Sequence, residues 1–129
     1  MQRNIIEQLR RWKDKKNRKP LVLAGARQVG KTYILKEFGK TEFSNVAYIN
    51  CDDNELAKDL FVKDYDIQRI ILAIGAITQQ TITAGKTLII LDEIQEVKRG
   101  MSALKYFCEN APEYHVAVAG LLLGIAMHQ

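Results

Sequence analysis

The segment GARQVGKT, residues 25–32, is the feature that most restricts what this chain can fold into. It has the pattern G-x-x-x-x-G-K-T, it follows the apolar run 21–24, and the stretch 33–38 after it has helical character. A strand, a glycine-rich turn and a helix in this order are the context that a phosphate-binding loop requires. The pattern therefore predicts a P-loop, the Walker A motif, rather than a chance turn.

The residue types in this loop match the chemistry of a nucleoside triphosphate. Gly25 and Gly30 permit backbone angles that a Cβ would disfavour, so successive N–H groups can point at a phosphate, and the following helix adds the positive end of its dipole. We expect Lys31 to reach the β- and γ-phosphates and the Thr32 hydroxyl to bind Mg²⁺. The predicted nucleotide-binding residues are Gly25, Ala26, Arg27, Gln28, Val29, Gly30, Lys31, Thr32 and Tyr33.

An acidic pair follows the apolar run 87–91, and that run is typical of a parallel strand covered on both faces. We expect Asp92 to hold Mg²⁺ through water, because Mg²⁺ keeps several of its waters. Glu93 is then placed to act as general base on the water that attacks the γ-phosphate, while Lys31 stabilises the charge. The alternative is an acidic pair that caps the next turn, but the position downstream of a P-loop favours a Walker B motif.

Other polar residues nearby give a less specific signal. Gln95 either faces the nucleotide or is an exposed loop residue, and the sequence leaves both open. Asn50 and the aspartates Asp52 and Asp53 lie at the carboxyl edge of the predicted sheet, where ligands bind in open α/β folds. We interpret them as turn residues rather than ligands.

Apolar patterning divides the chain into alternating helices and strands. Residues 5, 6, 9 and 12 are apolar at helical spacing, which predicts an amphipathic N-terminal helix that packs on the rest of the domain. Strands are expected at 21–24, 46–50, 87–91 and 114–119, and helices from the P-loop to Phe38 with Gly39 as C-cap, at 54–61, 67–81 and 102–110. We predict a P-loop NTPase fold, a three-layer α/β/α arrangement with a mostly parallel sheet. Residues 1–18 form its amphipathic helix and basic linker, and 19–129 its core.

Composition excludes several other classes of protein. The 129 residues suffice for one domain, and 47% hydrophobic with 26% charged residues is an ordinary globular composition. The sequence shows no signal peptide and no apolar run of membrane-spanning length, so we expect a cytoplasmic protein without a membrane partner. The two cysteines and two histidines have no metal-ligand spacing, so we expect no structural zinc site.

The chain is mildly basic, with a net charge of +4 and a pI of about 9.1. Part of this charge lies in the run 10–19, RRWKDKKNRK. Such a run could contact nucleic acid or an acidic partner. The alternative is a solvated helix end and linker, which is the simpler interpretation.

Four segments, GARQVGKT, NVAYIN, LDEIQE and LKYFCENAPEYH, occur in that order along the chain. With them the sequence resembles the AAA-type ATPase domain of bacterial and archaeal P-loop ATPases over essentially its whole length. The resemblance implies an AAA-type core with strand order 5-1-4-3-2, ATP and Mg²⁺ as cofactors, and the roles given above to Lys31, Thr32, Asp92 and Glu93. Proteins of this kind carry a C-terminal domain that is suspected to be nuclease-like.

Two departures from the family pattern affect the expected activity. Leu121 stands where the family has a serine that can sense the γ-phosphate, and leucine cannot donate a hydrogen bond. The chain also stops at Gln129, before the fifth strand, helical lid and arginine finger, so we expect a truncated product or an excised fragment that hydrolyses ATP slowly. Without a fifth strand the first strand would form a sheet edge, which predicts self-association through that edge.

The leading hypothesis is therefore an ATP-binding AAA-type ATPase domain with Mg²⁺-dependent binding and slow hydrolysis. The alternative is a non-catalytic module that binds a nucleotide or phosphate and serves assembly or regulation. A second alternative is a nucleic-acid-associated fragment that uses the basic run 10–19.

Overall fold

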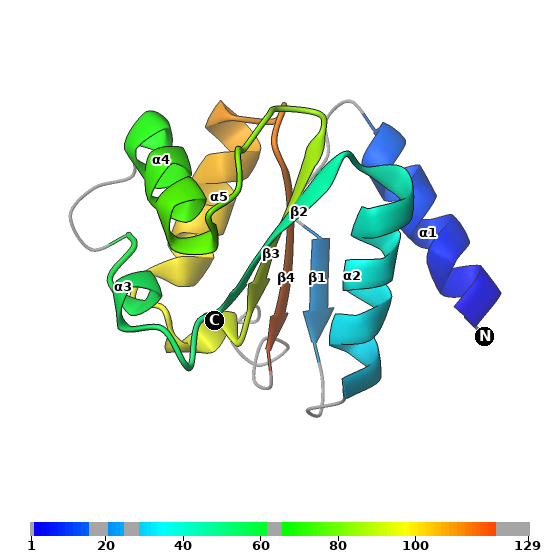
Figure 1. The fold of residues 1–129 in the computed structure, drawn as a ribbon, viewed down its shortest axis with the longest axis horizontal. Helices are drawn as coiled ribbons and strands as arrows, with labels where there is room; N and C mark the ends of the chain where they lie inside the picture. Colours follow the sequence, from blue (N-terminus) through cyan, green and yellow to red (C-terminus); the bar gives the residue numbers. More distant parts are fainter. Residues whose placement is uncertain (1, 16–20, 25–28, 62–65, 121–129) are drawn as a thin grey trace.

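The computed structural model describes residues 2–15, 21–24, 29–61 and 66–120, and for residues 2–5, 22–24, 29–31, 101 and 108 it describes the backbone alone. Helices and strands alternate along the chain, as predicted (Figure 1). In chain order they are α1 (Gln2–Asp14), β1 (Leu21–Ala24), α2 (Val29–Glu42), β2 (Asn45–Asn50), α3 (Glu55–Lys58), α4 (Ile67–Thr78), β3 (Thr87–Asp92), the 3₁₀ helix η1 (Ile94–Glu96), α5 (Gly100–Asn110) and β4 (His115–Gly120).

The described strands form one parallel sheet in the order β1-β4-β3-β2. This is the order that the resemblance to AAA-type ATPases implies for these strands, with β1 beside β4 rather than beside its sequence neighbour β2. Asn50 of β2 is paired in register with Asp92 of β3, so the carboxyl ends of these strands meet at the same level. The sheet thus brings the carboxyl end of β1 and the acidic pair after β3 to one edge.

Helices cover both faces of the sheet, with α1 and α2 on one side and α3, α4 and α5 on the other (Figure 1). Successive residues of a strand point to opposite faces, and residues 88–91 of β3 are apolar on both: Leu88 and Ile90 pack toward α1 and α2, whereas Ile89 and Leu91 pack toward α4 and α5. The sheet separates two apolar cores. Burial on both faces is the reason that the run 87–91 does not alternate with polar residues.

The N-terminal helix α1 packs on the face that also carries α2. Leu9 and Trp12 are buried there, and the Trp12 ring meets the His115 ring edge-on at 5.5 Å between centroids. The Nε2 atom of His115 lies 3.0 Å from the backbone oxygen of Lys13, so the imidazole contacts one of the carbonyls that a helix end leaves without an intrahelical partner. The start of β4 thereby anchors the end of α1.

Gly39 does not cap α2, and this prediction was wrong. The helix continues to Glu42, and Gly39 is buried within it where α2 crosses β2 and β3. A Cβ at Gly39 would overlap the side chain of Val46 and lie 3.1 Å from Cδ2 of Leu88. The glycine is therefore required by the close approach of helix and sheet rather than by a left-handed turn.

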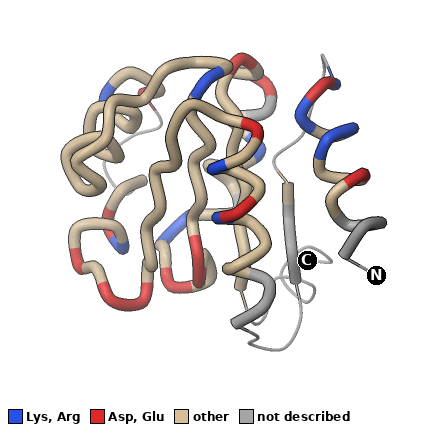
Figure 2. The backbone as a smooth tube through the Cα atoms, turned by 45° about the vertical axis from the view of Figure 1, so that its right-hand side comes forward, with Lys and Arg blue, Asp and Glu red and all other residues tan. Residues whose placement is uncertain are grey.

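Charged residues are distributed unevenly. Figure 2 shows Lys and Arg along the described part of α1 and acidic residues in the loops at the lower edge, where β2 and β3 end. Arg10 forms an ion pair with Glu42 at 3.4 Å, and Arg11 one with Glu7 at 4.0 Å. Residues 16–19 of the basic run lie outside the described residues, so the nucleic-acid interpretation stays a prediction. Within the described part of the chain, none of the helices has the length and apolarity needed to cross a membrane.

Candidate functional site

The predicted nucleotide-binding residues fall into two groups in the structure. The loop residues Gly25, Ala26, Arg27 and Gln28 lie outside the described residues. Val29, Gly30, Lys31, Thr32 and Tyr33 are the first five residues of α2. The backbone N–H groups of a helix's first turn have no intrahelical acceptors, and together with the dipole they favour an anion at this end.

The Thr32 hydroxyl and the Asp92 carboxylate, which the sequence analysis paired across the motifs, are in direct contact. Thr32 Oγ1 donates a hydrogen bond to Asp92 Oδ2 at 2.9 Å. The bond joins the first turn of α2 to the end of β3 although the two residues are 60 positions apart. The structure therefore brings together the two side chains that were predicted to bind Mg²⁺.

A third side chain, Tyr48 of β2, completes this contact, and the sequence analysis had missed it. The Tyr48 hydroxyl donates to the same Oδ2 atom of Asp92 at 2.7 Å, while the backbone N–H of Glu93 donates to Oδ1 at 3.0 Å. The sequence held part of the signal, because side chains alternate between the two faces along the predicted strand 46–50. Because Ala47 and Ile49 face the core on the α4 side, Tyr48 must face α2.

Glu93 lies immediately after β3 in a left-handed conformation, with φ 55° and ψ 47°. For a residue with a Cβ this conformation costs about 1–3 kcal/mol and persists only where the surroundings impose it. Glu93 is only 9% exposed. The sharp turn thus directs a carboxylate inward beside Asp92, at the edge where the first turn of α2 begins.

Gln95 is a neighbour of Glu93 rather than an exposed loop residue. Its Nε2 donates to Glu93 Oε1 at 3.0 Å. The opposite assignment of the amide would place two acceptors against each other, so the contact fixes which amide atom faces the carboxylate. The Gln95 Oε1 atom is buried and has no hydrogen-bond partner among the described residues. The amide nitrogen of Gln95 therefore holds Glu93, and the amide oxygen is available as a hydrogen-bond acceptor.

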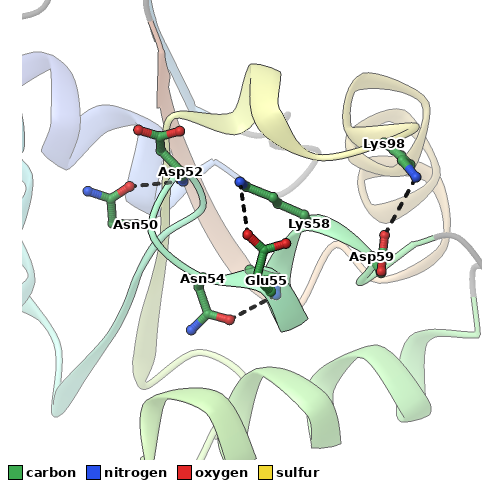
Figure 3. A network of polar contacts seen from close by, with 8 residues as sticks. Asn50, Asp52, Asn54, Glu55, Lys58, Asp59 and Lys98 are labelled. Atoms are coloured by element: carbon green, nitrogen blue, oxygen red, sulfur yellow. Dashed lines mark hydrogen bonds and ion pairs between the residues drawn. The ribbon is translucent and has the colours of Figure 1, made fainter.

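The polar residues at the end of β2 and just after it form hydrogen bonds within their own segment, residues 50–57. Asn50 Oδ1 accepts from the Asp52 N–H at 3.0 Å, and Asn54 Oδ1 accepts from the Ala57 N–H at 3.0 Å, which caps α3 (Figure 3). Ion pairs of Lys58 with Glu55 and of Lys98 with Asp59 surround this turn. These contacts agree with the interpretation of Asn50 and Asp52 as turn residues.

Two weak acids beside Asp92 are held in their neutral forms. Burial, with a smaller effect of the Asp92 and Glu93 carboxylates, raises the pKa of the Cys51 thiol to about 12. Burial and the hydrogen bond to Asp92 raise the pKa of Tyr48 above its usual value. The Tyr48 hydroxyl therefore keeps its proton and donates a hydrogen bond to the carboxylate across the physiological pH range.

The oxygen atoms of Thr32 and Asp92 suit a hard cation that also binds oxygens of a bound phosphate. Mg²⁺ binds oxygen atoms, usually one or two carboxylates together with phosphates and water. The Thr32 hydroxyl and the Asp92 carboxylate are oxygen donors of this kind. No group of three or more His, Cys, Asp or Glu side chains that could hold a metal occurs in the described part of the chain. A cation here would thus depend on oxygens from a bound phosphate.

Comparison with known proteins agrees with this geometry. The sequence model of a family described as "AAA domain" matches residues 17–129. Among solved structures the chain is similar to the Walker-type ATPase PABY2304 of Pyrococcus abyssi, with a TM-score of 0.57 and 15% sequence identity over 95% of this chain. The chain spans 45% of the length of that protein. No curated protein matches the sequence.

Proposed function

Because the chain belongs to the AAA domain family and its fold is similar to that of a Walker-type ATPase, we propose that it binds ATP together with Mg²⁺ and hydrolyses it. One observation carries the proposal: the hydrogen bond at 2.9 Å between Thr32 in the first turn of α2 and Asp92 at the end of β3. A chance glycine-rich turn has no reason to present its threonine to the carboxylate of a separate motif.

In the proposed binding mode each half of the site has its own task. The first turn of α2 presents N–H groups and Lys31 to the phosphates, and Thr32 and Asp92 hold Mg²⁺, with Asp92 acting through water. Mg²⁺ supplies neutralisation of phosphate charge when it is bound. The Thr32 hydroxyl can lend its oxygen to a cation while its hydrogen stays on Asp92, since a hydroxyl has one donor and two acceptor positions.

In the proposed hydrolysis Glu93 is the general base. Its carboxylate is inward-facing and fixed by Gln95 at 3.0 Å, so it can accept a proton from a water aligned with the γ-phosphate. The Gln95 Oε1 atom has no hydrogen-bond partner among the described residues, so it can serve as a second acceptor for this water.

ATP binding and turnover of the wild type and of Lys31→Ala test the proposal. Lys40→Ala is the matched control, because Lys40 is an exposed lysine near the other end of the same helix. We expect Lys31→Ala to abolish both binding and turnover and Lys40→Ala to leave both unchanged. Binding without turnover in the wild type would favour the non-catalytic module. Absence of ATP binding by the folded wild type would refute the proposal.

A further inference from the structure

Tyr48 is a side chain outside the two sequence motifs that donates a hydrogen bond to the Asp92 carboxylate. It comes from β2, the outer strand on that side of the described sheet. Its ring is covered by Lys36 of α2, whose Nζ lies 3.9 Å from the ring centroid. The phenol is therefore held between the sheet and α2, with its hydroxyl directed along the strands to the end of β3.

The hydrogen bonds at Asp92 leave little acceptor capacity unused. A carboxylate offers about four lone-pair positions. Thr32 and Tyr48 occupy both positions of Oδ2, and the Glu93 N–H occupies one of Oδ1. Among the described residues one position, on Oδ1, remains for a further donor. The arrangement suits a carboxylate that accepts a hydrogen bond from a cation's water rather than one that binds the cation directly.

We propose that Tyr48 is a positioning residue for the Mg²⁺ complex of ATP: by occupying Oδ2 beside Thr32 it fixes the rotation of the Asp92 carboxylate and presents Oδ1 to a metal-bound water. The inference rests on the proposed function of the same site. It assigns a metal-orienting task to β2, a strand that carries neither motif.

The physical reason is that the carboxylate of an aspartate rotates easily about its terminal torsion. The terminal torsion of Asp has a broad, roughly two-fold profile, so hydrogen bonds rather than intrinsic preference fix the plane of the carboxylate. When the Thr32 oxygen binds a cation, the Tyr48 hydroxyl continues to donate its hydrogen bond to Oδ2, which is 2.7 Å long in the structure. Loss of the phenol hydroxyl would free the plane of the carboxylate to rotate, and removal of such supporting contacts lowers metal affinity about 10–100-fold in other proteins.

Tyr48→Phe removes the hydroxyl and keeps the ring under Lys36. The matched control is Tyr114→Phe on the opposite face of the sheet, where Tyr114 packs edge-on against Phe107. ATP affinity is measured by calorimetry with excess Mg²⁺ and again with EDTA, and Mn²⁺ binding in the presence of ATP by electron paramagnetic resonance. Thermal unfolding followed by circular dichroism shows which variants fold, and Tyr48→Leu removes the hydroxyl by a second route.

We expect Tyr48→Phe to lower the affinity for ATP about tenfold or more in Mg²⁺, to leave it unchanged in EDTA, and to weaken Mn²⁺ binding by a similar factor, with Tyr114→Phe like the wild type. If Tyr48→Phe fails to fold, the same selective loss is required of Tyr48→Leu. Equal losses in Mg²⁺ and EDTA, or no loss in either, would overturn the inference while the proposed function stands. A wild type whose ATP affinity does not depend on Mg²⁺ would overturn both.

Discussion

The substitution Gly39→Ala tests how closely α2 is fitted to the sheet that carries the site. Gly39 is buried in the middle of α2, and an added Cβ would overlap the side chain of Val46 and approach Leu88 to 3.1 Å. The same helix carries Lys31 and Thr32 in its first turn. A displacement of α2 from β2 and β3 would therefore also alter the contact between Thr32 and Asp92.

Two opposing effects set the magnitude for Gly39→Ala. Alanine is favoured over glycine inside a helix by about 1 kcal/mol. Inserting a methyl group into a filled space costs about 1–3 kcal/mol, because neighbouring side chains or the backbone must move. The overlap with Val46 is severe enough that something must shift. We expect the free energy of unfolding to fall by about 1 kcal/mol, with overpacking outweighing helix propensity.

Guanidinium denaturation of four proteins measures this: the wild type, Gly39→Ala, Val46→Ala and the double variant. In the Val46→Ala background the overlap with Val46 is removed and the 3.1 Å approach to Leu88 remains, so Gly39→Ala should no longer lower stability, and helix propensity should raise it by up to about 1 kcal/mol. The double-mutant cycle isolates the pairwise term. A Gly39→Ala protein as stable as the wild type, or an equal loss in both backgrounds, would show that helix and sheet are not in the contact described.

Other substitutions test the acidic segment and the loop after β2. Glu93→Gln should leave ATP affinity unchanged and lower turnover about 10²–10⁴-fold, the usual contribution of a general base. Gln95→Leu should lower turnover less, because Glu93 then loses only the hydrogen bond from Gln95. Binding assays and steady-state kinetics check both predictions. Asn54→Ala should lower the free energy of unfolding by about 1 kcal/mol, since the side chain caps α3, and urea denaturation measures it. Burial raises the pKa of Cys51 from 9.0 to about 12, so between these values the native state holds a proton that the unfolded state has lost, and stability should fall as pH rises. Cys51→Ala should show a smaller decline in unfolding free energy over the same pH range, and an identical decline would contradict the assignment.

Much of the fold could be predicted from the sequence because its signals are local or follow from the motif. The run 87–91 is apolar without alternation, which indicates a strand buried on both faces, and β3 is such a strand. The resemblance to AAA-type ATPases implies the sheet order, and the observed order β1-β4-β3-β2 agrees. The pairing of Thr32 with Asp92 follows from the same topology, since both lie at the carboxyl edge.

The remainder depends on contacts between distant segments. Gly39 follows a helical run and resembles a C-cap, and only the distance between α2 and Val46 reveals why a glycine is needed. Tyr48 looks like an ordinary strand aromatic until the register of β2 against β3 places its hydroxyl beside Asp92. The left-handed backbone of Glu93 is imposed by its surroundings and has no local sequence signal.

The pairing of β1 with β4 has a consequence for the order in which the protein becomes functional during synthesis. Leu21 lies beside Ala117, and in the described sheet β1 has no other neighbour. β1 leaves the ribosome early, but it finds its partner only after β4, residues 115–120, has been made. The phosphate-binding half of the site is therefore expected to mature late, and ATP added to a nascent chain should be captured only once β4 has emerged.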